Sequence, residues 1–343
     1  AEDELAAIGI AIGAGWNGAR AFTATSGPGI SLMSEFLGLA YFAEIPFVLI
    51  NVQRAGPSTG MPTRTQQADI LSCAYASHGD TKQVLLFPDS PSECFDFTAL
   101  AFDLADQLQT PIILMSDLDL GMNDHLSEEF SWDDEREYQL GKVLSATQLD
   151  EIKHYGRYVD SDDDGICYRT LPGTHPDKGA FFTRGTSRNE YAGYTEKSAD
   201  YVNNMQRLNK KFVTASQLVP EPEITQGNKL ASIALVYFGT SAHPIAECRA
   251  QLKEHGLAVD TLRIKAFPFQ SKISEFIAQH DNIFVIEQNR DSQMRTLLIS
   301  ELSIDPKKLS AIANGDGLPM TSQTIVAAVL KELAEQASSQ QAG

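Results

Sequence analysis

The feature that most restricts the fold of this chain is an alternation of helical and strand patterns along its first 120 residues. Segments with apolar residues at helical spacing are each followed by a short run of apolar residues, many of them β-branched or aromatic. The expected helices are 2–17, 32–42, 66–76 and 91–107, and the expected strands are 21–24, 47–51, 84–87 and 111–116. Because such alternation produces parallel strands covered by helices, residues 1–120 are predicted to form an α/β domain with a parallel sheet.

The rest of the chain divides into an irregular part and a second alternating part. Residues 121–225 are rich in Asp, Gly, Thr and Pro, which predicts an irregular connecting or interface segment. Residues 226–336 are predicted to form a second, smaller α/β domain. Its expected strands are 232–238, 258–264 and 282–287, and its expected helices are 243–255, 271–279, 291–301 and 321–336. Residues 337–343 are expected to be a disordered tail.

Charge and cysteine content exclude several classes of protein. The formal net charge of −18 argues against nucleic acid or an anionic membrane as a partner. No apolar stretch reaches the roughly 18 residues that a membrane span needs. The four cysteines are scattered without a CxxC pair, so we expect no metal site in this chain and a reducing compartment, the cytoplasm.

The segment from Phe47 to Asp69 carries the clearest chemical signal. An apolar strand ends there, Arg54 follows it, and a loop rich in glycine and proline comes next. In open α/β sheets, ligands bind beyond the carboxyl ends of the strands. The planar guanidinium of Arg54 would suit a carboxylate or a phosphate at that place. The alternative is a tight turn whose arginine pairs with a nearby acid.

A glutamate lies on the apolar face of the first expected helix. Counted from Glu4, the residues Ile8, Ala11, Ile12 and Gly15 follow at spacings of four, seven, eight and eleven. A carboxylate in line with a buried face is costly unless it is paired or used in catalysis. The alternative is an acid at a helix N-terminus that the helix dipole stabilises, which is common.

The turn from Thr25 to Gly29 joins a strand to a helix. Its glycines allow a close approach of the backbone, and the helix start supplies free N–H donors. The spacing is not that of a P-loop or a dinucleotide-binding turn, so a simple capped turn remains an equal alternative.

Several blocks of this sequence resemble one family of enzymes. The block EDELAAIGIAIGAGWNGARAFTATSGPGISLMSEFLGLAYFAEIPFVLINVQRAGPSTGMPTRTQQADIL resembles the pyrimidine-binding domain of the 2-oxoacid:ferredoxin oxidoreductases. The segments GICYRTLPGTHPDKGAFFTRGTSRNEY, AFPF and FVIEQNRDSQMRTLL resemble the same family. Together they are most similar to its 2-oxoglutarate-type alpha subunits, and the resemblance covers nearly the whole chain.

The resemblance implies a fold and roles for particular residues. It implies a thiamine-diphosphate-binding-type pyrimidine domain followed by a domain like the C-terminal domain of transketolase. Glu4 matches the glutamate that contacts N1′ of the aminopyrimidine in thiamine enzymes. Arg54 and Thr63 match positions that hold the 2-oxoacid, and Thr25, Ser26 and Gly27 match a loop near the cofactor. The C-terminal domain is expected to contain no chemistry, and its polar segment 287–290 is expected to be an interface or an electrostatic feature near the electron acceptor or a subunit boundary.

The resemblance also implies cofactors and partners. The family uses thiamine diphosphate, shared with a beta subunit that is expected to hold Mg²⁺ and a 4Fe–4S cluster. Coenzyme A is the co-substrate, ferredoxin the electron acceptor, and an α2β2-type assembly is expected. The implied reaction is the oxidative decarboxylation of 2-oxoglutarate to succinyl-CoA, or its reverse.

One departure from the family pattern concerns the start of the chain. Family members usually carry, ahead of this region, a gamma-type domain and a first strand with a Tyr-Pro-x-Thr-Pro motif. Neither is present in this sequence. We therefore expect a downstream piece of a longer polypeptide, whose first sheet lacks one strand.

Two other interpretations remain open from the sequence. A beta-type subunit of a lipoamide-linked 2-oxoacid dehydrogenase also has a helix glutamate and a C-terminal α/β domain, but lacks the QRAGPSTG loop. A non-catalytic scaffold subunit would use its α/β domains only to support an assembly.

Overall fold

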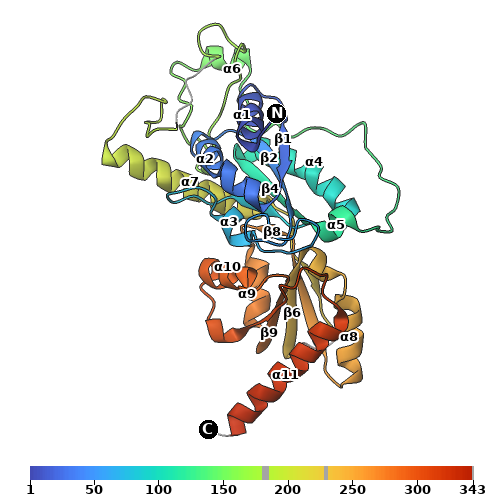
Figure 1. Ribbon diagram of the computed structural model, residues 1–343. Coiled ribbons are helices and arrows are strands. Elements are labelled where there is room, and N and C mark those ends of the chain that lie inside the picture. The colour runs from blue at the N-terminus through green and yellow to red at the C-terminus, as the bar shows by residue number, and fades with distance from the viewer. Residues whose placement is uncertain (180–184, 228–230, 342–343) are drawn as a thin grey trace.

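The computed structural model describes residues 1–179, 185–227 and 231–341 and contains two five-stranded sheets, one above the other in Figure 1. Within these residues, no helix is both long enough and apolar enough to span a membrane. The α/β fold class predicted from the sequence is confirmed, because neighbouring strands within each sheet are mostly parallel.

The first sheet is built almost entirely from the first 120 residues. Its strands, in spatial order, are β1 (Phe22–Thr25), β2 (Phe47–Gln53), β4 (Pro111–Asp117), β3 (Val84–Leu86) and β8 (Ala266–Phe267). Strand β8 is antiparallel to β3 and comes from the second half of the chain. The accompanying helices are α1 (Glu4–Trp16), α2 (Gly27–Ala43), α3 (Ile70–Ala74) and α4 (Pro91–Leu108). In Figure 1, α1 and α2 lie on one side of the sheet and α4 on the other.

The second sheet is covered by helices on both faces. Its strands, in spatial order, are β10 (Leu309–Ala313), β9 (Asn282–Glu287), β6 (Ile233–Phe238), β7 (Val259–Ile264) and β5 (Glu223–Thr225). Its α-helices are α8 (Ile245–Glu254), α9 (Ser271–Ala278), α10 (Gln293–Leu302) and α11 (Ser322–Gln341), and its 3₁₀ turns are η1 (Gly239–Ala242) and η2 (Pro306–Lys308). Helices α8 and α11 share one apolar cluster, whereas α9 and α10 belong to the cluster that also contains the first sheet. One apolar cluster therefore spans both sheets, and a second lies on the other face of the second sheet.

Local signals explain where the main helices begin. Asp3 precedes α1, and its side chain accepts a hydrogen bond from the backbone N–H of Ala6 at 2.7 Å. Ser90 caps α4 in the same way, and Pro91 occupies the first helical position, where a missing N–H costs nothing.

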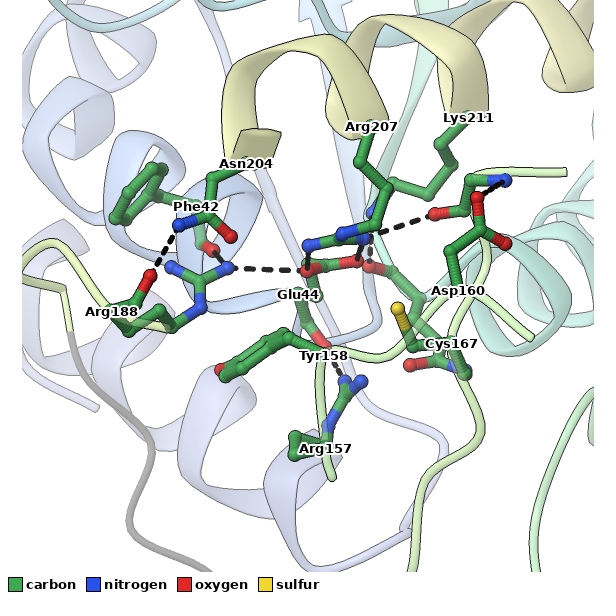
Figure 2. Close-up of polar contacts among 12 residues, drawn as sticks. Phe42, Glu44, Arg157, Tyr158, Asp160, Cys167, Arg188, Asn204, Arg207 and Lys211 are labelled. Carbon is green, nitrogen blue, oxygen red and sulfur yellow. Dashed lines mark hydrogen bonds and ion pairs between the residues drawn. The ribbon is translucent and has the colours of Figure 1, made fainter. Parts of the chain in front are cut away.

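The segment between the two sheets is tied to the first domain by a buried ion cluster (Figure 2). It contains α5 (Leu118–Met122), α6 (Ala146–Glu151) and α7 (Ser198–Leu218). The carboxylate of Glu44, just after α2, pairs with Lys211 at 3.0 Å and with Arg188 at 3.2 Å, and Arg207 donates to it at 2.9 Å. Arg157 donates to the backbone carbonyl of the same residue at 3.1 Å. All five side chains are buried, so Glu44 neutralises part of a dense positive cluster.

The structure corrects several expectations about elements. The segment 121–225 is not irregular throughout, because α7 is a helix of 21 residues. The expected tail 337–343 is helical as far as Gln341, and its last two residues lie outside the described part. Strands β5, β8 and β10 were not expected, and α3 is shorter than the helix predicted at 66–76.

Candidate active site

The turn between β1 and α2 lies beside the end of β2, at the carboxyl edge of the first sheet. Strands β1 and β2 are parallel, and Thr25 lies opposite Asn51 in their register. Ser26 precedes α2, which begins at Gly27. Arg54 follows the last residue of β2 directly. The predicted cofactor turn and the predicted substrate arginine therefore belong to neighbouring strand ends.

The predicted apolar stripe of α1 is confirmed, and Glu4 lies at its start. The four stripe residues that were expected on this face are the ones buried in the helix: Ile8, Ala11, Ile12 and Gly15. Because Asp3 caps the helix, Glu4 is not needed for that role. Glu4 is partly buried, and within the described residues its carboxylate makes no hydrogen bond or ion pair.

Glu4 and the turn meet at Gly29. A Cβ atom placed on Gly29 would lie 1.8 Å from Oγ1 of Thr25 and 3.1 Å from Cγ of Glu4. Any residue larger than glycine at position 29 would therefore collide with Thr25 and Glu4 unless these side chains moved. The glycine thus allows the start of α2 to approach the start of α1 closely, and brings Glu4 and Thr25 together.

A carboxylate that the sequence did not reveal occupies the start of α2. A Cβ on Gly27 would lie 3.0 and 3.1 Å from the two carboxylate oxygens of Asp69. Asn51 donates to one of these oxygens at 3.1 Å, and the backbone N–H of Asp69 donates to Gln53 at 3.2 Å. Burial raises the pKa of the Asp69 carboxyl, against the opposing effects of Asn51 and the charge of Arg54. An ionised carboxylate here would repel an anion, which argues against a phosphate-binding role for this turn.

Arg54 lies at this edge with its donors unused. Its Nε atom is buried and has no hydrogen-bond partner among the described residues. No carboxylate of those residues lies within 4.0 Å of its guanidinium, and the influence of Arg54 on Asp69 acts over a longer distance. The alternative in which Arg54 pairs with a nearby acid is therefore disfavoured. Its guanidinium N–H groups remain available to donate hydrogen bonds to a bound ligand.

Thr63 lies on the same loop as Arg54 but is exposed. The loop is closed by hydrogen bonds from the backbone N–H of Ala55 to the carbonyl of Arg64 at 2.8 Å, and from Met61 to Ala55 at 2.9 Å. The structure shows no hydrogen bond between Thr63 and Arg54. The two predicted substrate residues thus belong to one closed loop.

The polar segment at the end of β9 lies at the boundary between the two sheets. Asn289 is buried and donates to the backbone carbonyl of Gln67 at 3.0 Å. Glu287 accepts from Asn289 at 2.7 Å and from two backbone N–H groups of α10, and burial raises the pKa of its carboxyl. Arg290 is exposed and pairs with the adjacent Asp291 at 2.7 Å. Asn289 therefore joins the two domains within this chain, whereas Arg290 remains exposed.

One cavity of the structure lies away from the predicted site residues. That cavity has a volume of about 570 Å³ and lies among Tyr41, Tyr75, Lys82 and Phe212. Lys82 there already pairs with Glu301 at 2.7 Å. Among the described residues, no group of three or more His, Cys, Asp or Glu side chains is arranged to hold a metal ion.

Comparisons with known proteins agree on one family. Residues 1–206 match the family described as pyruvate flavodoxin/ferredoxin oxidoreductase, thiamine diphosphate-binding. The chain is 34% identical to 2-oxoacid:ferredoxin oxidoreductase 2, subunit alpha, of Aeropyrum pernix, over 97% of this chain and 51% of that protein. It is 31% identical to the 2-oxoglutarate synthase subunit KorA of Methanothermobacter thermautotrophicus, over 84% of this chain and 74% of that protein.

A solved structure agrees with these relatives. The 2-oxoglutarate:ferredoxin oxidoreductase of Magnetococcus marinus, solved with 2-oxoglutarate, coenzyme A and succinyl-CoA bound, superposes with a TM-score of 0.82 at 27% identity. The match covers 97% of this chain and 56% of that one. The chain thus spans about half the length of the Aeropyrum and Magnetococcus proteins. On these matches, the chain belongs to the thiamine diphosphate-binding family of pyruvate flavodoxin/ferredoxin oxidoreductases.

Proposed function

We propose that this chain is the alpha subunit of a thiamine diphosphate-dependent 2-oxoacid:ferredoxin oxidoreductase, and that its substrate is 2-oxoglutarate. One observation carries the proposal. Glu4 and Arg54, the two charged residues expected at the site, approach the same sheet edge and have no ion pair among the described residues. The substrate is inferred from the 2-oxoglutarate synthase relative and from the ligands of the Magnetococcus structure.

The residues at this edge fit the aminopyrimidine part of thiamine diphosphate. Gly27 and Gly29 allow Asp69, Thr25 and Glu4 to pack closely against the start of α2, so these side chains lie together beside the proposed binding place. When bound, thiamine diphosphate supplies the carbanion chemistry that removes carbon dioxide from a 2-oxoacid. The proposed role of Glu4 is to hold a proton at N1′ of the aminopyrimidine, which requires a carboxylate that no other protein group already occupies.

The proposed roles of Arg54 and Thr63 concern the substrate. The guanidinium of Arg54 presents parallel N–H donors that can bind a carboxylate of the 2-oxoacid through two hydrogen bonds. Thr63, exposed on the same loop, would contribute a hydroxyl when substrate is present. Thr25, Ser26 and Gly27 are proposed to contact the cofactor.

Further parts of the reaction are proposed to lie in partners. A beta subunit is expected to hold Mg²⁺, the diphosphate and a 4Fe–4S cluster, and to pass electrons to ferredoxin, within an α2β2-type assembly. Coenzyme A accepts the acyl group. All four cysteines of this chain are free, which agrees with a cytoplasmic location.

The proposal is tested by the variant Glu4→Gln in the assembled complex. Reduction of a viologen dye by 2-oxoglutarate and coenzyme A should fall by about 100-fold or more, because a positioned proton-transfer group is lost. The matched control is Glu2→Gln, which changes an exposed acid of the same segment and should leave the rate unchanged. Full activity in the Glu4 variant would show that this assignment is wrong.

A further inference from the structure

The loop that carries Arg54 ends at Gln67, a residue held by the second domain. Gln67 is buried, with 1% of its surface exposed. Its backbone N–H donates to the carbonyl of Gln288 at 2.7 Å, and its carbonyl accepts from the side chain of Asn289 at 3.0 Å. Both partners directly follow β9, so the backbone of the loop is fixed to the carboxyl edge of the second sheet.

The side-chain amide of Gln67 strengthens this connection. Its oxygen accepts from the hydroxyl of Ser241 at 2.9 Å and from the backbone N–H of Gln288 at 3.2 Å. Its nitrogen makes longer contacts of 3.4 to 3.5 Å with Thr240, the carbonyl of Phe238 and Asp117. Donors and acceptors of both domains thus surround one buried amide, and hydrogen bonds in such a low-dielectric surrounding hold the loop against the second domain.

The second domain touches the loop at another place as well. A Cβ atom on Gly317 would lie 2.7 Å from Cε of Met61 and 3.0 Å from Cβ of Arg64. The side chain of Gln66 accepts from the backbone N–H of Gly56 at 3.0 Å, which joins the two ends of the loop. The position of the loop therefore depends on contacts with the second domain at its end and along its length.

We propose that Gln67 is a positioning residue through which the second α/β domain sets the affinity of the Arg54 loop for the 2-oxoacid. The inference rests on the proposed function, since Arg54 is taken to bind the substrate carboxylate. Displacement of a binding group by about 1 Å can cost a large factor in rate or affinity, because a bidentate hydrogen bond depends steeply on geometry. The second domain, expected to be free of chemistry, would act on the reaction through this residue.

The test uses the variant Gln67→Met, which keeps the length of the side chain and removes the amide. In the assembled complex, KM for 2-oxoglutarate should rise by about tenfold, while kcat and KM for coenzyme A change much less. The matched control is Gln270→Met, because the amide of Gln270 also joins the second domain to another part of the chain, donating to the carbonyl of Val219 at the end of α7 at 2.8 Å. The control should leave all three constants unchanged.

A second variant and a second readout separate this inference from the proposed function. Ser241→Ala removes one donor to Gln67 and should produce a smaller increase in KM in the same direction. Phenylglyoxal modifies arginine side chains, and mass spectrometry measures how fast it labels Arg54. Labelling should be faster in the Gln67 variant than in the Gln270 variant, and this result does not depend on which 2-oxoacid is the substrate. Equal labelling, or equal effects on KM for both substrates, would contradict the inference. An unmodified complex that oxidises no 2-oxoacid would instead defeat the proposed function.

Discussion

At the scale of single residues, the contrast between paired and unpaired charged side chains supports the proposed site. Asp69 receives a hydrogen bond from Asn51, and Asp3 caps α1. Glu4 and Arg54 lie beside them and have no such partner within the described residues. A charged group that the fold leaves unpaired, in a partly buried position, costs stability unless a ligand uses it.

The role of Arg54 is tested by Arg54→Lys. The apparent KM for 2-oxoglutarate should rise by about tenfold or more, because the compact ammonium of lysine cannot form two parallel hydrogen bonds with a carboxylate. Steady-state kinetics of the assembled complex measure this. Arg64→Lys, on the same loop and exposed, is the control and should have no effect on KM. An unchanged KM in the Arg54 variant would mean that this residue is structural.

The sequence predicted some of these residues and not others. The stripe from Ile8 to Gly15 placed Glu4 on a buried face, because helical periodicity is a local signal. Asp69 and Gln67 could not be predicted in their roles, since their partners are Gly27 and residues near position 288. Contacts over such sequence separations depend on how the two domains pack, which no local pattern records.

At the scale of elements, the end of α2 is fixed by one carboxylate. Glu44 has a left-handed backbone conformation with φ of 61°, and its side chain is fully buried among cations of α7 and of the connecting segment. The charges of Arg207 and Lys211 hold the pKa of this carboxyl well below its usual range, although burial opposes them. Burial, in turn, lowers the pKa of Lys211 to about 8.

This cluster predicts opposite outcomes for two substitutions. Glu44→Gln leaves buried cations without their counter-charge and should lower the free energy of unfolding by about 3–5 kcal/mol. Lys211→Met removes one cation from a cluster with excess positive charge and should be neutral or stabilising, because it also removes a desolvation penalty. Denaturant unfolding of both variants measures the difference. Equal destabilisation by the two would contradict this account of the cluster.

An ion pair between a histidine of the second domain and an aspartate of α5 predicts that the stability of the protein depends on pH. His243, after η1, pairs with Asp119 of α5 at 3.4 Å, and its Nε2 donates to the backbone carbonyl of Asp89 at 2.7 Å. The hydrogen bond with Asp119 raises the pKa of His243 above 6.5. Because the pKa of His243 is higher in the folded state than in the unfolded state, protonation of His243 stabilises the folded protein. This contribution is fully present when the pH lies below the unfolded-state pKa, and it is lost as the pH rises through the folded-state pKa.

The variant His243→Gln tests this dependence. The difference in unfolding free energy between the unsubstituted protein and the variant should be larger at about pH 5.5 than at about pH 8.5. His78→Gln is the control, because His78 and its partner Glu35 are both largely exposed and should show little pH-dependent effect. A difference that grows with pH would contradict the assigned direction.

Most elements were predictable, and those that were missed share physical reasons. The strand at 282–287 was predicted with the bounds that the structure shows. Helix α7 was missed because its buried face includes Asn204, Arg207 and Lys211, so apolar periodicity is weak there. Strands β5 and β8 have three and two residues, which is too short for a pattern to emerge.

At the scale of the whole molecule, the two α/β domains meet at the polar ends of their strands, and one apolar cluster spans both sheets. Asp117 ends β4 of the first sheet and accepts from Thr240, which follows β6 of the second, at 2.5 Å. Strand β8 extends the first sheet from the second half of the chain. The molecule is therefore expected to act as one body that presents the edge with Glu4 and Arg54 to a partner.

The central claim is that this chain supplies one side of a thiamine diphosphate site that a beta subunit completes. The most direct measurement is viologen reduction by 2-oxoglutarate and coenzyme A, with this chain alone, the beta partner alone, and the two assembled within the full-length enzyme. The account predicts no reduction by either part and rapid reduction by the assembly, which Glu4→Gln in this chain lowers by about 100-fold or more. Decarboxylation by the chain alone, or an assembly that is insensitive to Glu4→Gln, would contradict it.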